Sequence, residues 1–173
     1  MRRIVLLIAA IAIAVAVYEG ARQRSHSPAG RPGAVSSPAA GFSLQGVDGR
    51  PLDLANYRGK VVLLNFWATW CTPCRAEIPQ FVAFQNTYGP QGLQLIGISM
   101  DDDAAPVREF YQQFRMNYPV AIGNAKLAQS YGGVLGLPVT FLIGRDGRIA
   151  AKYVGAADLG VLRQQIESLL QKK

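Results

Sequence analysis

The sequence predicts an α/β domain with a mixed central sheet flanked by helices, and three observations support this fold class. Mostly apolar runs of strand length at 61–68 and 93–99 are typical of strands buried on both faces. The helical pattern between them completes a strand, helix, strand unit, whose two strands run parallel. Further along, two apolar runs flank Asp146-Gly147, a dipeptide typical of hairpin turns, so an antiparallel pair joins the sheet.

The first half of the domain contains the elements around the first buried strand. Ahead of it we expect two short strands, at 42–44 and 52–54, and after it a helix over 72–88 that ends at Gly89-Pro90. Apolar spacing predicts that one face of this helix is buried. The residues of that face are Ile78, Phe81, Val82 and Gln85.

The second half holds the remaining strands and helices. Asp101, Asp102 and Asp103 precede apolar residues at helical spacing. We interpret these acids as helix caps rather than metal ligands, because carboxylates stabilise helix N-termini. The other expected elements are a strand at 118–122, a helix at 126–131, strands at 139–143 and 149–154, and a last helix capped by Asp158.

The N-terminus is predicted to be an export signal followed by a tether. Two arginines precede an apolar run at 4–17. These residues would span only about 21 Å of a ~30 Å hydrocarbon core, which favours a cleaved signal peptide. The small-x-small triplets lie inside the run rather than after it, which favours an uncleaved anchor. We expect an anchor at 1–18, a flexible Pro- and Gly-rich linker at 19–41 and the domain at 42–173.

Composition excludes several classes of function. The net charge is +7, but five of the basic residues lie in the first forty positions, and no basic stripe with aromatic residues follows, so we expect no nucleic-acid binding. Two cysteines and one histidine cannot form a four-ligand zinc site, and we expect neither metal nor cofactor. His26 lies in the predicted linker, which leaves no histidine base for Cys-His or Ser-His-Asp catalysis.

Both cysteines lie in one motif, Trp70-Cys71-Thr72-Pro73-Cys74, between a buried strand and a helix. A thiol at a helix N-terminus meets unpaired N–H groups, which stabilise its thiolate form. We therefore expect Cys71 to be the exposed nucleophile and Cys74 the more buried resolving thiol. Pro73 fits the first helical turn, where its missing N–H costs nothing. A structural disulfide, half of a shared metal site and two unreactive thiols are the alternatives.

Two stretches, VVLLNFWATWCTPCRAEIP and LGLPVTFLIGRDGRI, resemble the membrane-anchored TlpA-like and ResA-like thiol-disulfide oxidoreductases of the redoxin superfamily. The resemblance covers nearly all of 42–173 and implies the thioredoxin fold, with short N-terminal strands and a central strand-helix insertion at about 100–122. It further implies that Pro138 is a cis-proline facing the disulfide. Leu137 would then offer its backbone to an extended substrate.

The resemblance also bears on the residues around the motif. Thioredoxin has a buried acid near the resolving cysteine, and Asn65 stands in that place here. Glu77 lies three residues after Cys74, on the same side of the helix, and matches an acidic residue beside the site in ResA-like proteins. A solvated side chain or an ion pair is the alternative for Glu77. Trp67 is expected in the core and Trp70 at the rim of the site.

The expected function is a reductant of disulfides in exported proteins such as apocytochrome c, a monomer recharged by a membrane electron-transfer protein. We expect it at the outer face of a bacterial cytoplasmic membrane, or free in the periplasm if the signal is cleaved. A disulfide oxidase or isomerase and a non-enzymatic binding module are alternatives. A peroxiredoxin-like peroxidase is another, but its chemistry needs Thr or Ser three residues before the reactive cysteine, where this chain has Ala68.

Overall fold

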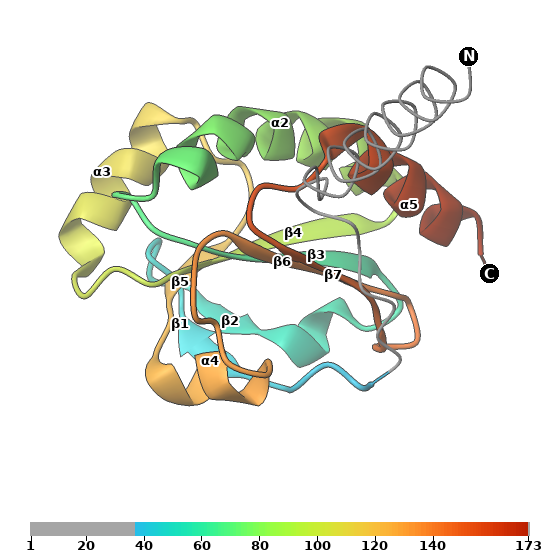
Figure 1. Cartoon of the computed structure of the whole chain (residues 1–173), viewed down its shortest axis with the longest axis horizontal. Coiled ribbons are helices and arrows are strands. Elements are labelled where there is room, and N and C mark those ends of the chain that lie inside the picture. The colour runs from blue at the N-terminus through green and yellow to red at the C-terminus, as the bar shows by residue number, and fades with distance from the viewer. Residues whose placement is uncertain (1–36, 173) are drawn as a thin grey trace, which may run out of the picture.

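The computed structural model describes residues 37–172 (Figure 1). The predicted anchor at 1–18, most of the predicted linker and His26 lie outside these residues. Within 37–172, no helix is both long and apolar enough to cross a membrane.

A five-stranded mixed sheet forms the centre of the domain, in the order β5-β4-β3-β6-β7. β3, β4 and β5 run parallel, whereas β6 lies antiparallel to β3 and β7 antiparallel to β6. The predicted mixed sheet is therefore confirmed. The strands are β3 (Val61–Trp67), β4 (Leu93–Ser99), β5 (Val120–Ile122), β6 (Val139–Ile143) and β7 (Ile149–Val154).

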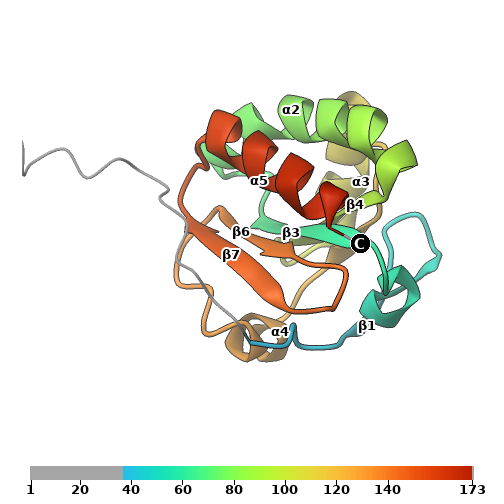
Figure 2. The same ribbon diagram turned by 90° about the vertical axis from the view of Figure 1, so that its right-hand side faces the viewer.

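Helices and a small hairpin cover the two faces of the sheet (Figures 1 and 2). Three helices lie on one face: α2 (Thr72–Tyr88), α3 (Ala104–Gln113) and α5 (Leu159–Gln171). The other face carries α4 (Ala125–Ser130) and the antiparallel pair β1 (Ser43–Gln45) and β2 (Pro51–Asp53). Two short 3-10 turns, η1 (Leu54–Tyr57) and η2 (Gly89–Gln91), complete the connections.

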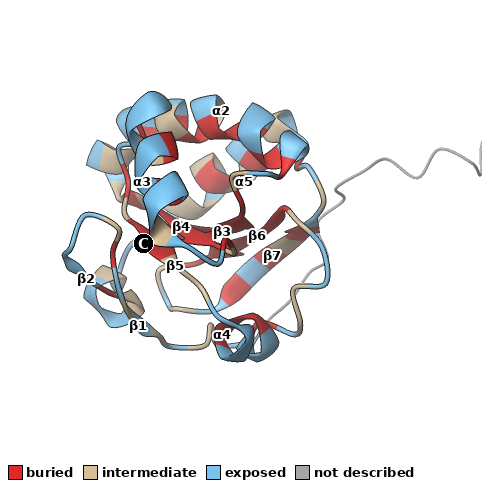
Figure 3. Ribbon diagram, turned by 90° about the vertical axis from the view of Figure 1, so that its left-hand side faces the viewer, coloured by how far each residue is buried: buried red, intermediate tan, exposed pale blue. Residues whose placement is uncertain are grey.

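β3 lies between two hydrophobic cores because both of its faces are apolar. Leu63 and Trp67 belong to the core beneath α2, α3 and α5, whereas Leu64 and Phe66 belong to the core on the side of α4. Every residue of β3 is buried, as the continuous apolar run predicted (Figure 3). The strand therefore holds its C-terminal end, and the motif that follows, in a fixed place.

The helix caps and the hairpin turn agree with the sequence prediction in most places. Asp103 caps α3 by accepting from the Ala105 N–H, and Asp158 caps α5 in the same way. Gly147 has a φ of 76°, the left-handed conformation that the β6–β7 turn requires. Of the three predicted capping acids at 101–103, Asp103 is the N-cap of α3, whereas Asp101 bonds Thr69 and Ser99 instead of a helix end.

The buried face of α2 is wider than the prediction. Its buried residues are Cys74, Glu77, Ile78, Phe81, Phe84 and Tyr88. Val82 and Gln85 are half-buried at the border of this face, where Val82 packs against the core and the Gln85 Oε1 atom accepts from the Leu95 N–H. The buried stripe begins at Cys74, one turn before the predicted face, and steps of three and four residues from there lead to Phe84 and Tyr88.

The end of the predicted linker belongs to the fold. The carbonyl of Ser37 accepts from the Ile149 N–H at 2.9 Å, and the Ala39 N–H donates to the Gly147 carbonyl at 2.9 Å. The Tyr131 hydroxyl bonds the Ala40 carbonyl. The predicted boundary at 42 is thus too late, because backbone pairing with the β6–β7 hairpin fixes residues whose composition alone indicates a linker.

Candidate active site

The two cysteines form a disulfide at the N-terminus of α2, directly after the loop that follows β3. Their Cα atoms are 5.3 Å apart, within the range that a disulfide requires. Cys71 is the N-cap residue of α2, and its sulfur accepts from the Cys74 N–H at 3.3 Å. Pro73 lies in the first turn, as predicted. The helix N-terminus thus directs an N–H group at the sulfur expected to become the thiolate.

Both sulfur-bearing residues are buried in the disulfide form. Cys71 is 5% exposed and Cys74 is 1% exposed. As predicted, Cys74 is the more buried of the two cysteines. The expectation that Cys71 is exposed is wrong, because Cys71 packs into the core beneath α2. Trp70, one residue earlier, is 68% exposed and lies at the rim, whereas Trp67 is fully buried.

The Leu137–Pro138 peptide bond is cis. Pro138 directly precedes β6, whose Val139 pairs with Phe66 near the end of β3. This register brings the start of β6 to the same end of the sheet as the disulfide. Leu137 packs against the hydrophobic core that contains both cysteines.

Glu77 is buried one turn after Cys74 and is 4% exposed. Its Oε1 atom accepts from the Ala157 N–H at 2.7 Å, and its Oε2 atom is buried with no hydrogen-bond partner in the described chain. Burial raises the pKa of Glu77 from 4.5 to about 7, although the bond from Ala157 acts in the opposite direction. The alternative of a solvated side chain is wrong, and no ion pair of Glu77 occurs within 37–172.

Asn65 occupies the sheet beneath α2 and is buried. Its Nδ2 atom donates to the Thr140 hydroxyl oxygen at 2.9 Å, across the β3–β6 pair. An amide at this place holds the strands together but cannot take up a proton from Cys74. Glu77 is therefore the carboxyl group placed on the same helix face as the resolving cysteine.

Sequence reasoning missed the role of Asp101. This residue is 8% exposed, and its carboxylate accepts bonds from the N–H and hydroxyl of Thr69 and from the hydroxyl of Ser99. The signal in the sequence was Ser99 at the end of a buried strand, followed two residues later by an acid. The residues described contain no cluster of three metal-ligating side chains.

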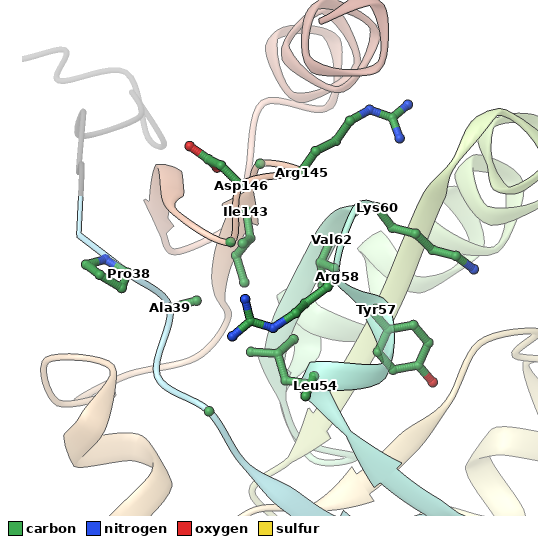
Figure 4. Close-up of a pocket in the computed structure, with 14 residues that line it drawn as sticks. Pro38, Ala39, Leu54, Tyr57, Arg58, Lys60, Val62, Ile143, Arg145 and Asp146 are labelled. Carbon is green, nitrogen blue, oxygen red and sulfur yellow. The ribbon is translucent and has the colours of Figure 1, made fainter. Parts of the chain in front are cut away.

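Neither cysteine lines the cavity of about 220 Å³ that the structure contains. Figure 4 shows the residues that do. The cavity lining includes Pro38 and Ala39 of the entering chain, Arg58, and the paired residues Val62 and Ile143. Val62 stands near the beginning of β3, whereas the disulfide follows the end of that strand. The cavity and the cysteine pair therefore occupy opposite ends of the sheet.

A cysteine pair at a helix N-terminus, at the same end of a mixed sheet as a cis-proline, defines a thioredoxin-fold thiol-disulfide oxidoreductase. The chain belongs to the AhpC/TSA family, whose model matches residues 35–152.

Curated relatives and solved structures agree with this class. The chain is 31% identical to the thiol-disulfide oxidoreductase ResA of Geobacillus thermodenitrificans, over 98% of this chain and 94% of that protein. It is 30% identical to ResA of Bacillus cereus, over 99% of this chain and 94% of the relative. A putative thiol:disulfide interchange protein DsbE from Chlorobium tepidum has 33% identity and a TM-score of 0.74, covering 79% of this chain and 97% of that one.

Proposed function

We propose that this oxidoreductase is a reductant of disulfides in exported proteins such as apocytochrome c, tethered by its N-terminal segment to the outer face of a bacterial cytoplasmic membrane. The observation that carries the proposal is the Cys71–Cys74 disulfide at the N-terminus of α2. The apolar run at 4–17 supports export. A membrane electron-transfer protein would return the disulfide to the dithiol, and the enzyme would act as a monomer.

The reaction is a thiol-disulfide exchange in two steps. The Cys71 thiolate attacks one sulfur of the substrate disulfide, and the other substrate sulfur leaves as a thiolate that takes up a proton. Cys74 then loses its proton and attacks Cys71 in the mixed disulfide, which releases the second substrate thiol. Two electrons pass to the substrate, and the enzyme ends as the disulfide seen in the structure.

Glu77 is the base in the second step. It follows Cys74 by one helical turn, a spacing that brings Cβ atoms within about 5–6 Å. A pKa of about 7 allows its carboxylate to accept the Cys74 proton at neutral pH and to release it afterwards. Its unpartnered Oε2 atom leaves one lone-pair acceptor free for this transfer.

The substrate docks beside the motif. Trp70 offers an exposed indole next to the nucleophile. Leu137 precedes the cis bond and offers its backbone to an extended chain, as its place in the motif implies. A substrate cysteine flanked by apolar residues would bury the Trp70 ring and so align its disulfide with Cys71.

The peroxidase alternative is not favoured. Ala68 stands three residues before Cys71 and carries no hydroxyl group. The nearby Thr69 hydroxyl donates to Asp101, so its proton is already used in a bond within the protein. No hydroxyl donor from this loop is therefore left for a peroxide oxygen.

The function is tested with the full-length chain in detergent micelles, reduced and freed of reductant. We expect it to reduce a disulfide-bonded C-x-x-C-H peptide, the haem-attachment motif, and to leave hydrogen peroxide unconsumed. A chain that consumes peroxide and leaves the peptide oxidised would contradict the proposal.

A further inference from the structure

The loop between β3 and α2 is held by groups that lie outside the Cys-x-x-Cys motif. Thr69 is the half-buried residue at its centre, and all three of its polar groups are engaged. Its N–H and hydroxyl both donate to the Asp101 carboxylate, the N–H at 2.9 Å. Its carbonyl accepts from the Arg75 guanidinium at 3.2 Å. The next two residues in the chain are Trp70 and the nucleophile.

Asp101 is itself fixed in place. Its Oδ2 atom accepts from the Ser99 hydroxyl at 2.6 Å, and its own N–H donates back to the same Ser99 oxygen at 3.1 Å. Ser99 is the last residue of β4 and is fully buried. The carboxylate is therefore anchored to the sheet and cannot follow a moving loop without losing these bonds.

Arg75 is fixed from the side of α3. Its guanidinium carbon lies 5.2 Å from the ring centre of Phe110 and 5.8 Å from that of Phe114. These two rings stack on each other at 4.1 Å, and Phe110 also contacts Trp67 at the end of β3. Stacking of a guanidinium on aromatic faces orients its N–H groups, here toward the Thr69 carbonyl.

Three residues that hold Thr69, either directly or through Arg75, come from one segment of the chain. Asp101, Phe110 and Phe114 all lie in the segment 100–122, between the end of β4 and the end of β5. Within the loop, the Cys71 N–H donates to the Ala68 carbonyl at 3.2 Å. The position of the loop thus depends in part on the segment 100–122, which contains no reactive group.

We propose that Asp101 and Arg75 hold Thr69 so that the loop after β3 presents its exposed indole and its sulfur together to a protein substrate. Thr69 is a positioning residue and touches no reacting atom. The segment 100–122 affects the exchange reaction by holding Thr69 in place. The inference rests on thiol-disulfide exchange with protein substrates, and it holds for either direction of electron flow.

The test compares the activity of the full-length chain with a large and with a small disulfide substrate. Both substrates are assayed in whichever direction of thiol-disulfide exchange the wild type catalyses. Insulin must dock beside Trp70 to react, whereas the small disulfide 5,5′-dithiobis(2-nitrobenzoate) must reach only the Cys71 sulfur. For Thr69→Val, we expect kcat/KM with insulin to fall about tenfold through KM, with less than a twofold change on the small disulfide. Thr69→Ser keeps the hydroxyl and should match the wild type. Thr87→Val, an exposed threonine on α2, is the matched control.

A double-mutant cycle tests the connection to Asp101. If the two residues act as one unit, Asp101→Asn and the double variant with Thr69→Val should each show the same loss as Thr69→Val alone. If Asp101→Asn does not fold, Arg75→Gln takes its place in the cycle, because Arg75 is the other residue that bonds Thr69. Wild-type kinetics of Thr69→Val with insulin, equal losses on both substrates, or effects that multiply in the double variant would each overturn the proposal. A wild type inactive on both substrates in both directions would instead refute the proposed function.

Discussion

The Glu77 carboxyl group is held by one backbone bond, from the Ala157 N–H at 2.7 Å, in the turn that leads into α5. Its second oxygen is buried without a partner among the described residues. A carboxylate with one bond in a buried place keeps its proton at higher pH than a solvated one does. This relationship makes Glu77 the titrating group beside the cysteine pair.

The first prediction concerns stability and pH. The pKa of Glu77 is about 7 in the folded protein and 4.5 when unperturbed, so the folded state retains a proton between these values. Its free energy of unfolding should therefore fall as pH rises from about 4.5 to about 7, by up to about 3 kcal/mol at 1.36 kcal/mol per pKa unit. Denaturant unfolding of the oxidised protein across this range measures the slope. Glu77→Gln should remove it, whereas exposed Glu109→Gln should not.

The second prediction concerns catalysis and pH. Glu77 must be ionised to accept a proton, so turnover at saturating substrate should rise with pH through an inflection near 7. In Glu77→Gln this inflection should disappear, and the rate at pH 7 should fall about a hundredfold. An unchanged pH profile in Glu77→Gln would show that Cys74 loses its proton to another group.

The third prediction separates the roles of the two sulfurs. Cys71→Ser should abolish insulin reduction, because the attacking thiolate is gone. Cys74→Ser should accumulate a mixed disulfide between Cys71 and the substrate, visible as a band of higher mass on a non-reducing gel. Insulin reduction by Cys71→Ser at the wild-type rate, or no trapped complex with Cys74→Ser, would contradict the assignment.

The fourth prediction concerns substrate docking by Trp70. Because its side chain is 68% exposed, Trp70→Ala should change the free energy of unfolding by less than about 0.5 kcal/mol. We expect KM for a protein disulfide to rise several-fold, while the reduction potential is unchanged. Trp70→Phe keeps an aromatic face and should show a smaller rise. A shift in potential without a change in KM would mean that the indole acts on the thiolate rather than on the substrate.

Local patterns predicted much of the fold because they act over short stretches of chain. The buried run at 61–68 and the bounds of α2, β4, β6 and β7 follow from apolar periodicity, turn residues and proline positions. The same patterns missed the packing of 37–41, which depends on backbone pairing with a hairpin more than a hundred residues later.

In the site, too, local spacing predicted some features, and contacts between distant elements produced the others. The spacing of Cys71 and Cys74 indicates a dithiol, because two intervening residues suffice to close a disulfide. The burial of Cys71 and the anchoring of Thr69 by Asp101 could not be read from spacing, since both depend on how separate elements meet. An acid after a strand has the same local pattern whether it caps a helix or holds a loop.

The reduction potential of the full-length protein tests the central claim most directly, measured by equilibration against glutathione and dithiothreitol buffers while the Cys71 thiolate is titrated. A dedicated reductant should have a value near or below about −270 mV, that of thioredoxin. A value approaching about −120 mV, with a strongly stabilised thiolate, would make the protein an oxidant or isomerase and contradict the proposed reduction of exported proteins.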